Sequence, residues 1–433
     1  MHLANHDSLT DLANRAAFNR RMSEVLSEAA ASGRQFGVIC FDLDRFKGIN
    51  DVFGHTVGDM ALRAAAQRLS SVAADNFLAR IGGDEFTLLV ADGPQPITTE
   101  RLAERLQEAM REDFEIDGKI IKLGLSIGVA IYPDDGTDEN TLLCRADAAL
   151  YRAKEEGRCA IRFFEPQMDE QRRERRALQH DMRTAIEHNE LMLHYQPRAK
   201  TSSEIVGFEA LARWQHPAHG MISPQTFIPL AEETGSIIQL GEWVLRAACR
   251  EAASWQRPLS ISVNLSPVQF RHSDLPALVH SILFETGISS RRLILEITES
   301  VLIDDLDSAL KILRQLKSLG VRIAMDDFGT GYSSLSYLHA FPLDQIKIDR
   351  SFMARLERSQ QSATIVRAVI GLGRALNLPV VAEGVETRKQ LDFLQREGCA
   401  EVQGFLIGKP HPIECYAQIV GRVAEEQALR RWA

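Results

Sequence analysis

The chain has 433 residues, enough for two domains or three, and its 45% hydrophobic and 25% charged residues are typical of soluble globular proteins. Its net charge of −9 argues against a general nucleic-acid binder, which needs a basic face to displace counterions from a polymer. No apolar run reaches the ~18 residues of a membrane span, and the N-terminus has no apolar signal-peptide core.

The six cysteines lie far apart and include no CxxC pair, so we expect neither a disulfide framework nor a zinc site. A reducing cytoplasm fits this pattern. The chain opens directly on a structured motif, so we expect a cytoplasmic protein or the cytoplasmic part of a longer, membrane-attached sensor. We expect no contact of this chain itself with a membrane.

Residues 1–165 predict a first domain of alternating strands and helices. Two predicted strands, NFLAR and FTLLV, flank the tetrapeptide Gly82–Glu85, which is a hairpin signal. The order β-α-β-β-α-β predicts an α/β domain of palm-like, ferredoxin-like type with a central, mainly antiparallel sheet. Outside the hairpin, strands are predicted at 37–41 and 123–132, and helices at 60–74, 98–112 and 141–156.

Residues 166–182 are highly charged, with apolar residues at helical spacing, and predict a linker helix between two domains. A solvated helix that only tethers the domains explains the pattern equally well. A heptad pattern does not persist over enough turns for a coiled coil.

Residues 183–433 contain seven short apolar runs that each end on a residue able to bind a metal or carry a proton. Helical sequence separates the runs, as in βα units with parallel strands. A TIM-like β/α barrel gathers catalytic groups from several strand ends on one face, and it is the simplest fold that unites these residues. The runs end at Glu209, Asn264, Glu296, Asp326 with Asp327, Lys347, Glu383 and Gln403.

The carboxylate and amide oxygens at these strand ends are the ligands that hard divalent cations prefer. So many carboxylates would repel one another in the absence of cations. A two-metal centre removes the repulsion and predicts hydrolysis of a phosphodiester by a water that the cations activate. Lys347 is suited to orient that water or to carry protons. Any single acid could follow a strand by chance, so the prediction rests on the whole set.

A second group of carboxylates lies in the first domain. Asp42 ends the first predicted strand, and Asp84 and Glu85 lie at the tip of the hairpin. These positions adjoin in a palm-like sheet, so the group is able to hold one or two Mg²⁺ ions. Taken alone, a hairpin tip of this composition is more often only a turn.

Four stretches of the first domain resemble the GGDEF family of diguanylate cyclases. They are DSLTDLANR (Asp7–Arg15), FDLDRFKGINDVFGHTVGD (Phe41–Asp59), RIGGDEF (Arg80–Phe86) and ALYRAKEEGR (Ala149–Arg158). The resemblance implies a homodimer that condenses two GTP molecules into cyclic di-GMP. It also implies metal binding by Asp42 and Asp84 with help from Glu85, guanine recognition by Asn50 and Asp59, and triphosphate binding by Lys47, Lys154 and Arg158.

Eight stretches of the second domain resemble the EAL family of cyclic di-GMP phosphodiesterases. They are LHYQP (Leu193–Pro197), FEALARW (Phe208–Trp214), SVNLSP (Ser262–Pro267), LEITES (Leu295–Ser300), DDFGTGYSSL (Asp326–Leu335), IKIDRSF (Ile346–Phe352), VAEGVET (Val381–Thr387) and QGFLIGKP (Gln403–Pro410). The resemblance implies a metal shell of Glu209, Asn264, Glu296, Asp326, Asp327 and Glu383. It implies that Lys347 and Gln403 manage the attacking water and that Arg213 holds a substrate phosphate.

The glycine-rich loop after the paired aspartates contains Phe328, Gly329, Thr330 and Gly331. It is either a flexible turn or a switch that couples dimer contacts to metal placement, with Glu299 as its anchor.

The two resemblances together predict an enzyme of cyclic di-GMP turnover, with Mg²⁺ or Mn²⁺ as cofactor. The expected partners are GTP, cyclic di-GMP and a second copy of the chain, and no polymeric nucleic acid is expected. Hydrolysis is the stronger prediction because its ligand set lies in one subunit. Two alternatives stay open: a phosphodiesterase whose first domain only binds GTP as an activator, and a non-catalytic cyclic di-GMP receptor.

Overall fold

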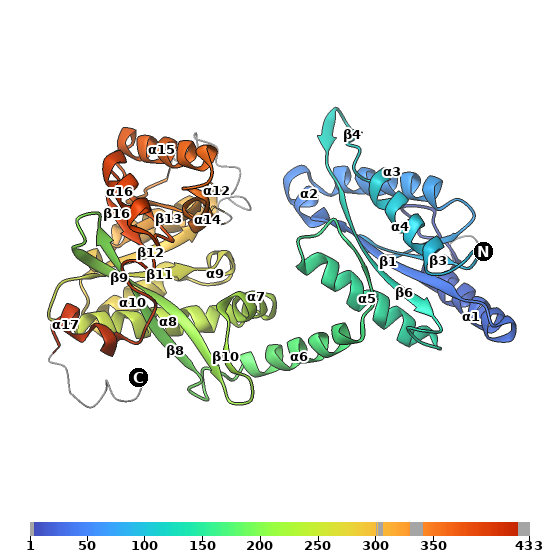
Figure 1. The fold of residues 1–433 in the computed structure, drawn as a ribbon, viewed down its shortest axis with the longest axis horizontal. Helices are drawn as coiled ribbons and strands as arrows, with labels where there is room; N and C mark the ends of the chain where they lie inside the picture. Colours follow the sequence, from blue (N-terminus) through green and yellow to red (C-terminus); the bar gives the residue numbers. More distant parts are fainter. Residues whose placement is uncertain (1–3, 300, 302–305, 330–340, 423–433) are drawn as a thin grey trace. The chain divides into compact units, whose positions relative to one another are not determined.

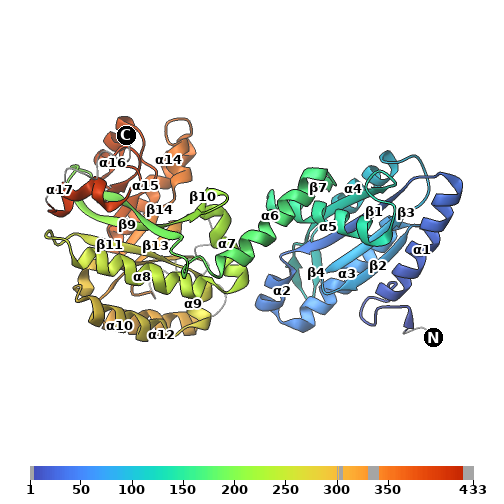
Figure 2. The ribbon, with the colours of Figure 1, turned by 90° about the horizontal axis from the view of Figure 1, so that it is seen from below.

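The computed structural model describes residues 4–299, 301, 306–329 and 341–422. Contacts between residues divide the chain into two compact units, Met1–Arg176 and Ala177–Ala433, drawn from two sides in Figures 1 and 2. The boundary falls inside α6 (Pro166–Met182). Within the described ranges, no helix combines the length and the apolar composition needed to cross a membrane.

The first unit is built on a five-stranded sheet with the order β2-β3-β1-β6-β7. Neighbouring strands are antiparallel except β6 and β7, which are parallel. The predicted mainly antiparallel sheet is therefore confirmed. The strands are β1 (Phe36–Asp44), β2 (Phe77–Gly82), β3 (Glu85–Val90), β6 (Gly124–Tyr132) and β7 (Ile161–Phe163), and a separate hairpin pairs β4 (Phe114–Ile116) with β5 (Lys119–Ile121).

Helices cover both faces of this sheet, so the central strand β1 is buried along its whole length. Ile39, Phe41 and Leu43 pack with apolar residues of α3 and α4, whereas Val38 and Cys40 pack with residues of α1 and α5. The alternation is that of a regular strand. The helices are α1 (Arg15–Ser32), α2 (Phe46–Phe53), α3 (His55–Ala73), α4 (Ile97–Ala109) and α5 (Glu139–Glu155).

The first unit departs from the sequence prediction in two respects. It contains α1, α2, the β4–β5 hairpin and β7, which were not predicted. Strand β1 also continues to Asp44 instead of ending at Asp42, because Leu43 is fully buried in the core while the two aspartates lie on the opposite face of the strand.

Eight strands close a barrel in the second unit, which confirms the predicted TIM-like β/α architecture. Seven of the strands are parallel, and the first, β8, is antiparallel to both of its neighbours, β16 and β9. The reversal of β8 was not predicted. The parallel strands are β9 (Ile205–His216), β11 (Ser260–Leu265), β12 (Leu293–Thr298), β13 (Arg322–Phe328), β14 (Gln345–Ile348), β15 (Val380–Ala382) and β16 (Glu401–Gln403); β8 spans Leu191–Lys200, and β10 (Gly220–Ile222) pairs with β9 outside the barrel.

Helices surround the barrel (Figure 1). They are α7 (Pro224–Thr234), α8 (Ile237–Ala253), α9 (Pro267–His272), α10 (Leu275–Thr286), α12 (Leu306–Ser318), α14 (Arg350–Arg355), α15 (Gln360–Ala375), α16 (Arg388–Glu397) and α17 (Ala417–Val420), with 3₁₀ turns η2 (Ser290–Arg292) and η3 (Ile413–Tyr416).

Each barrel strand buries apolar side chains outward against the helices and turns the alternate residues inward. In β12, Leu293, Leu295 and Ile297 belong to the large apolar cluster of this unit, so Glu296 faces the interior. Most β/α barrels fill the interior with branched apolar residues. Here it is polar, because Arg198, Ser260, Gln345 and Lys347 are also buried.

Candidate active sites

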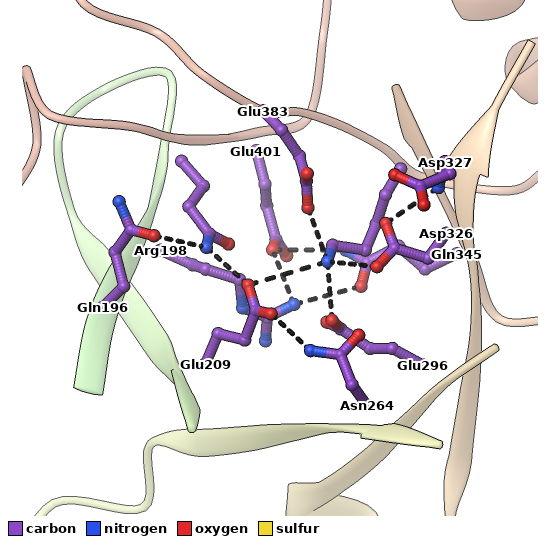
Figure 3. A network of polar contacts seen from close by, with 12 residues as sticks. Gln196, Arg198, Glu209, Asn264, Glu296, Asp326, Asp327, Gln345, Glu383 and Glu401 are labelled. Carbon is purple, nitrogen blue, oxygen red and sulfur yellow. Dashed lines mark hydrogen bonds and ion pairs between the residues drawn. The ribbon is translucent and has the colours of Figure 1, made fainter. Parts of the chain in front are cut away.

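The barrel brings its predicted site residues to one mouth, at or near the carboxyl ends of the strands. Figure 3 shows Glu209, Glu296, Asp326 and Glu383 pointing toward one another. One boundary was wrong: the strand that carries Glu209 continues to His216. The remaining positions are Asn264 on β11, Asp327 on β13, Lys347 on β14 and Gln403 at the end of β16.

A β-bulge allows two consecutive aspartates to share the interior. Side chains of a regular strand alternate between its faces, yet Met325 and Phe328 both belong to the outer apolar cluster. The ladder with β14 shifts register between these two residues, and Asp327 has a φ of 52°. The extra residue lets Asp326 and Asp327 both face the mouth, where one carboxylate oxygen from each of them and one from Glu383 lie within 4.8 Å of one another.

Lys347 lies at the centre of the cluster, with its side chain only 1% exposed. Its Nζ is 2.5 Å from Glu383 Oε1, 2.6 Å from Glu296 Oε2 and 3.2 Å from Asp326 Oδ2. Glu209 Oε2 is 3.7 Å away. One ammonium thus faces four carboxylates, and negative charge stays in excess whenever all four are ionised.

The carboxyl groups of the cluster differ in the direction in which their pKa values are shifted. Burial raises the pKa of Glu296 to about 7, with Glu209 and Asp326 adding to the rise and Lys347 opposing it. Burial and the neighbouring carboxylates also raise the pKa of Glu383, and they raise that of Asp327 to about 6. The pKa of Glu209 is instead lowered: burial acts against ionisation, but Lys347, Gln403 and Asn264 outweigh it.

Glu209 is held by two amides. Asn264 Nδ2 donates to its Oε1 at 2.6 Å, and Gln403 Nε2 donates to its Oε2 at 2.5 Å. Gln403 Nε2 also donates to Gln196 Oε1 at 3.0 Å, and Gln196 lies opposite Glu209 in the β8–β9 ladder. Gln196 was not predicted as a site residue, although it stands in the LHYQP stretch.

The mouth fits divalent cations. Three buried oxygens in it make no hydrogen bond to any residue that the structure describes: Glu296 Oε1, Glu383 Oε1, which is in ion-pair contact with Lys347, and Gln403 Oε1. Buried polar atoms without partners are costly and rare, and oxygen donors in this number suit Mg²⁺ or Mn²⁺. The residues present therefore match the metal that the sequence predicts.

Arg213 stands apart from the acidic cluster and lines a cavity that Asn264, one of the predicted metal ligands, also lines. It lies on β9 four residues beyond Glu209 and donates from Nη1 to its neighbour's carbonyl oxygen, Ala212 O, at 2.8 Å. It lines a cavity of about 430 Å³ together with Asn264 and Thr298. A ligand in this cavity would meet a cation on one side and the metal-site amide on the other.

Glu299 contacts the start of the glycine-rich loop: its Oε1 accepts the backbone N–H of Gly329 at 3.2 Å. Phe328 is buried in the core. Thr330 and Gly331, the other two residues of the predicted regulatory loop, lie outside the described residues. The anchor role of Glu299 stays a prediction.

The Glu299→Ala variant should lower hydrolysis about tenfold and change substrate affinity by less than threefold. The bond to Gly329 N lies two residues from Asp327, so its loss misplaces a metal ligand without removing one, and such outer contacts are worth 10- to 100-fold. Turnover and binding of cyclic di-GMP, measured side by side, test this. Unchanged turnover would rule the anchor out.

The first unit brings Asp42, Asp84 and Glu85 to one end of its sheet. Asp42 faces Glu85 in the β1–β3 ladder, and the backbone N–H of Leu43 donates to Asp84 O at 3.3 Å. Lys154, near the end of α5, places Nζ 2.7 Å from Asp42 Oδ2. Burial raises the pKa of Asp42 to about 6, with Lys154 opposing the rise and Asp84 adding to it.

The residues predicted to read guanine lie on adjacent helices. Asn50 on α2 packs against α3 at Gly58, where a Cβ would lie 1.8 Å from Asn50 Oδ1. Only glycine admits the amide there, directly beside Asp59. Lys47 and Arg158, predicted to bind the triphosphate, are exposed.

Two family models match this chain. Residues 4–160 match "Diguanylate cyclase, GGDEF domain", and residues 179–410 match "EAL domain", more than half of the chain. The chain belongs to the tandem GGDEF–EAL family. Its GGDEF domain carries the hairpin site, and its EAL domain carries the barrel mouth.

Named relatives share both domains. The bifunctional diguanylate cyclase/cyclic di-GMP phosphodiesterase MucR of Pseudomonas aeruginosa is 44% identical over 98% of this chain. The cyclic di-GMP phosphodiesterase PdeR of Escherichia coli is 39% identical over 95%. The chain spans little more than half the length of such curated relatives, 62% of MucR and of PdeR.

A solved structure matches the EAL domain. The phosphodiesterase of MucR from Pseudomonas aeruginosa, in complex with cyclic di-GMP, is 49% identical and has a TM-score of 0.54; the match covers 55% of this chain and 99% of that one.

Proposed function

We propose that the EAL domain hydrolyses cyclic di-GMP to linear pGpG with divalent cations. The observation that carries the proposal is the convergence of oxygen ligands at the mouth, where Glu296 and Glu383 each keep a buried oxygen that makes no hydrogen bond to any described residue. The similarity of this domain to the MucR phosphodiesterase, whose structure holds cyclic di-GMP, supports the choice of substrate.

The metal ligands would be Glu209, Asn264, Glu296, Asp326, Asp327 and Glu383, which lie on the neighbouring strands β9, β11, β12 and β13 and directly after β15. Bound cations supply Lewis-acid activation of a water and stabilisation of charge on the phosphate. In the reaction the water oxygen bonds to phosphorus, the P–O3′ bond breaks, and the 3′ oxygen leaves with a proton.

The other residues of the mouth position the reactants. Gln403 is fixed by Glu209 and Gln196 through its amide nitrogen. Its Oε1, which accepts no hydrogen bond from the described residues, is therefore available to accept one from the attacking water. Lys347 keeps its proton, because the carboxylates around it raise its pKa despite burial. Its charge stabilises the cluster before and after substrate binds. Arg213 supplies a cation for a phosphate oxygen.

We further propose that the GGDEF domains of two chains condense GTP into cyclic di-GMP. Asp42, Asp84 and Glu85 would hold the cations, Asn50 and Asp59 the guanine, and Lys47, Lys154 and Arg158 the triphosphate. The proposal is supported by the convergence of the three carboxylates at one end of the sheet.

One experiment separates the two activities. The purified chain is incubated with Mg²⁺ and either cyclic di-GMP or GTP, and the nucleotides are resolved by chromatography. We expect pGpG from the first substrate. From GTP we expect cyclic di-GMP only when the Glu209→Gln substitution prevents its hydrolysis. Binding of cyclic di-GMP without consumption of either substrate would instead indicate a receptor, and GTP that only raises hydrolysis would indicate an activator.

The Asp84→Asn variant, made together with Glu209→Gln, should form cyclic di-GMP from GTP at least 100-fold more slowly than Glu209→Gln alone. Asp84 lies beside Asp42, and removing one of the three charged groups proposed to hold the cations costs several kcal/mol of transition-state stabilisation. Asp92→Asn, an exposed aspartate beyond the same hairpin, is the matched control. Equal synthesis in both variants would contradict a metal role for Asp84.

A further inference from the structure

Asp44 is a buried carboxylate that the proposed reactions do not use. It is the last residue of β1 and is 7% exposed. Its Oδ1 accepts the hydroxyl of Ser126 on β6 at 2.7 Å. Its Oδ2 accepts the backbone N–H of Cys159 at 3.0 Å and faces the thiol of Cys159 at 3.4 Å. One carboxylate therefore ties β6 to the turn that follows α5.

That turn has an unfavourable backbone. Gly157, Arg158 and Cys159 have φ of 118°, 65° and 48°. A left-handed conformation costs roughly 1–2 kcal/mol at each non-glycine residue, so the surroundings must hold it. The turn is closed at its start by the N–H of Arg158, which donates to Ala153 O at 3.1 Å. Asp44 holds the residue directly after Arg158.

The neighbouring strand makes room for this contact. Gly124 lies opposite Asp44 in the β1–β6 ladder. A Cβ on Gly124 would lie 2.5 Å from Cys159 Sγ and 3.0 Å from Asp44 Oδ2. A side chain at this position would push the turn away from β1. The glycine leaves room for the turn, and Asp44 holds the turn in place by hydrogen bonds.

Asp44 and Asp42 face the same side of β1, since they are two residues apart, about 7 Å along the strand. Asp42 contacts Lys154 near the end of α5, and Asp44 contacts Cys159 in the turn. The strand that carries a proposed metal ligand therefore also contacts Lys154 and the turn of Arg158, two of the three basic residues assigned to the triphosphate.

We propose that Asp44 is a positioning residue for nucleotide binding: it seats the turn so that Arg158 is held beside the triphosphate site. The inference rests on the proposed GTP site of the GGDEF domain and deepens it. Arg158 is exposed, and a long side chain on an unseated turn would lose more conformational entropy on binding.

The first arm of the test examines the anchor without any nucleotide. In the full chain with Cys144→Ser and Cys415→Ser, the three other cysteines besides Cys159 are buried. Burial and Asp44 raise the pKa of the Cys159 thiol. Adding Asp44→Asn should therefore speed alkylation of Cys159 by iodoacetamide severalfold. An unchanged rate overturns the inference, whatever GTP does.

The second arm measures the Kd of GTP with Mg²⁺. Asp44→Ala should weaken binding about tenfold, and Asp44→Asn, which keeps the size and one acceptor, should weaken it less. In an Arg158→Ala background, Asp44→Ala should weaken binding less than twofold further, because it acts through Arg158. An equal loss in both backgrounds, or no loss in either, overturns the inference while leaving the GTP site intact.

The binding measurements need a folding control and a GTP site that binds. Circular dichroism and thermal unfolding establish that each variant is folded. If Asp44→Ala is not folded, GTP binding is compared for Asp44→Asn by itself and for Asp44→Asn combined with Arg158→Ala. If the unmodified chain binds no GTP, the proposed nucleotide site fails, and this inference fails with it.

Discussion

The Glu209→Gln variant should lose hydrolysis of cyclic di-GMP by about three orders of magnitude, because metal assistance supplies several kcal/mol to such reactions. Glu209 accepts hydrogen bonds at both oxygens, one from Asn264 and one from Gln403. A glutamine has one acceptor oxygen, so its NH₂ group must face one of these two donors. The substitution thus removes a charge, disturbs an amide contact and keeps the side-chain volume.

The matched control is Glu204→Gln, in the same β8–β9 hairpin, where the exposed Glu204 forms an ion pair with the exposed Lys200 at 2.7 Å. Its turnover should stay within twofold of the unmodified chain, since exposed ion pairs contribute little. Formation of pGpG is followed by chromatography with Mg²⁺ and with Mn²⁺. Substantial turnover by Glu209→Gln with either cation would exclude Glu209 from the metal shell.

The Lys347→Met variant should lower the stability of the metal-free EAL domain by about 3–5 kcal/mol, the cost of removing one partner from a buried ion pair. Methionine fills similar space, so packing is preserved. What is lost is the only cation that the described residues place in direct contact with Glu296, Asp326 and Glu383. Hydrolysis should fall as well.

The deficit should depend on pH. In the folded chain burial and neighbouring carboxylates raise the pKa of Glu296 from its usual 4.5 to about 7, against the opposing effect of Lys347. A carboxyl whose pKa is raised on folding favours the folded state fully below pH 4.5, and this contribution is lost as the pH rises toward 7. Without Lys347 the pKa rises further, so the deficit of Lys347→Met should be smaller at pH 5 than at pH 8.

Thermal unfolding in the presence of a chelator measures this, with Lys200→Met as the control at an exposed ion pair. Divalent cations should restore more of the stability of Lys347→Met than they add to the control, because they neutralise the same carboxylates. A deficit that does not change with pH or with cations would show that packing, and not charge, explains the loss.

The residues at the barrel mouth could be predicted from the sequence, because each of them is a polar residue at the end of an apolar run. Val263 and Leu265 pack outward on either side of Asn264, and the same alternation surrounds Glu296. Side chains two residues apart share a face. The alternation that predicts each strand therefore also indicates which polar side chain faces the interior. The hairpin carboxylates followed from an equally local signal, the turn between two strands.

Other parts of the site depend on relations that the sequence pattern does not encode. Alternation is the same in either strand direction, so the antiparallel β8, and with it the approach of Gln196 to Gln403, could not be predicted. The only sign of the bulge that turns Asp327 inward is that Met325 and Phe328, three residues apart, face the same side of the strand. The sequence pattern does not indicate a role for Asp44, because its partner, Cys159, lies 115 residues away.

The proposed hydrolysis is tested most directly by the fate of cyclic di-GMP when it is incubated with the purified chain and Mg²⁺ or Mn²⁺. Binding is measured together with chromatography of the products, before and after the cation is removed with a chelator. We predict that cyclic di-GMP becomes pGpG, that hydrolysis stops with the chelator, and that it resumes when the cation is restored. Cyclic di-GMP that binds and is recovered intact at saturating cation would contradict this prediction.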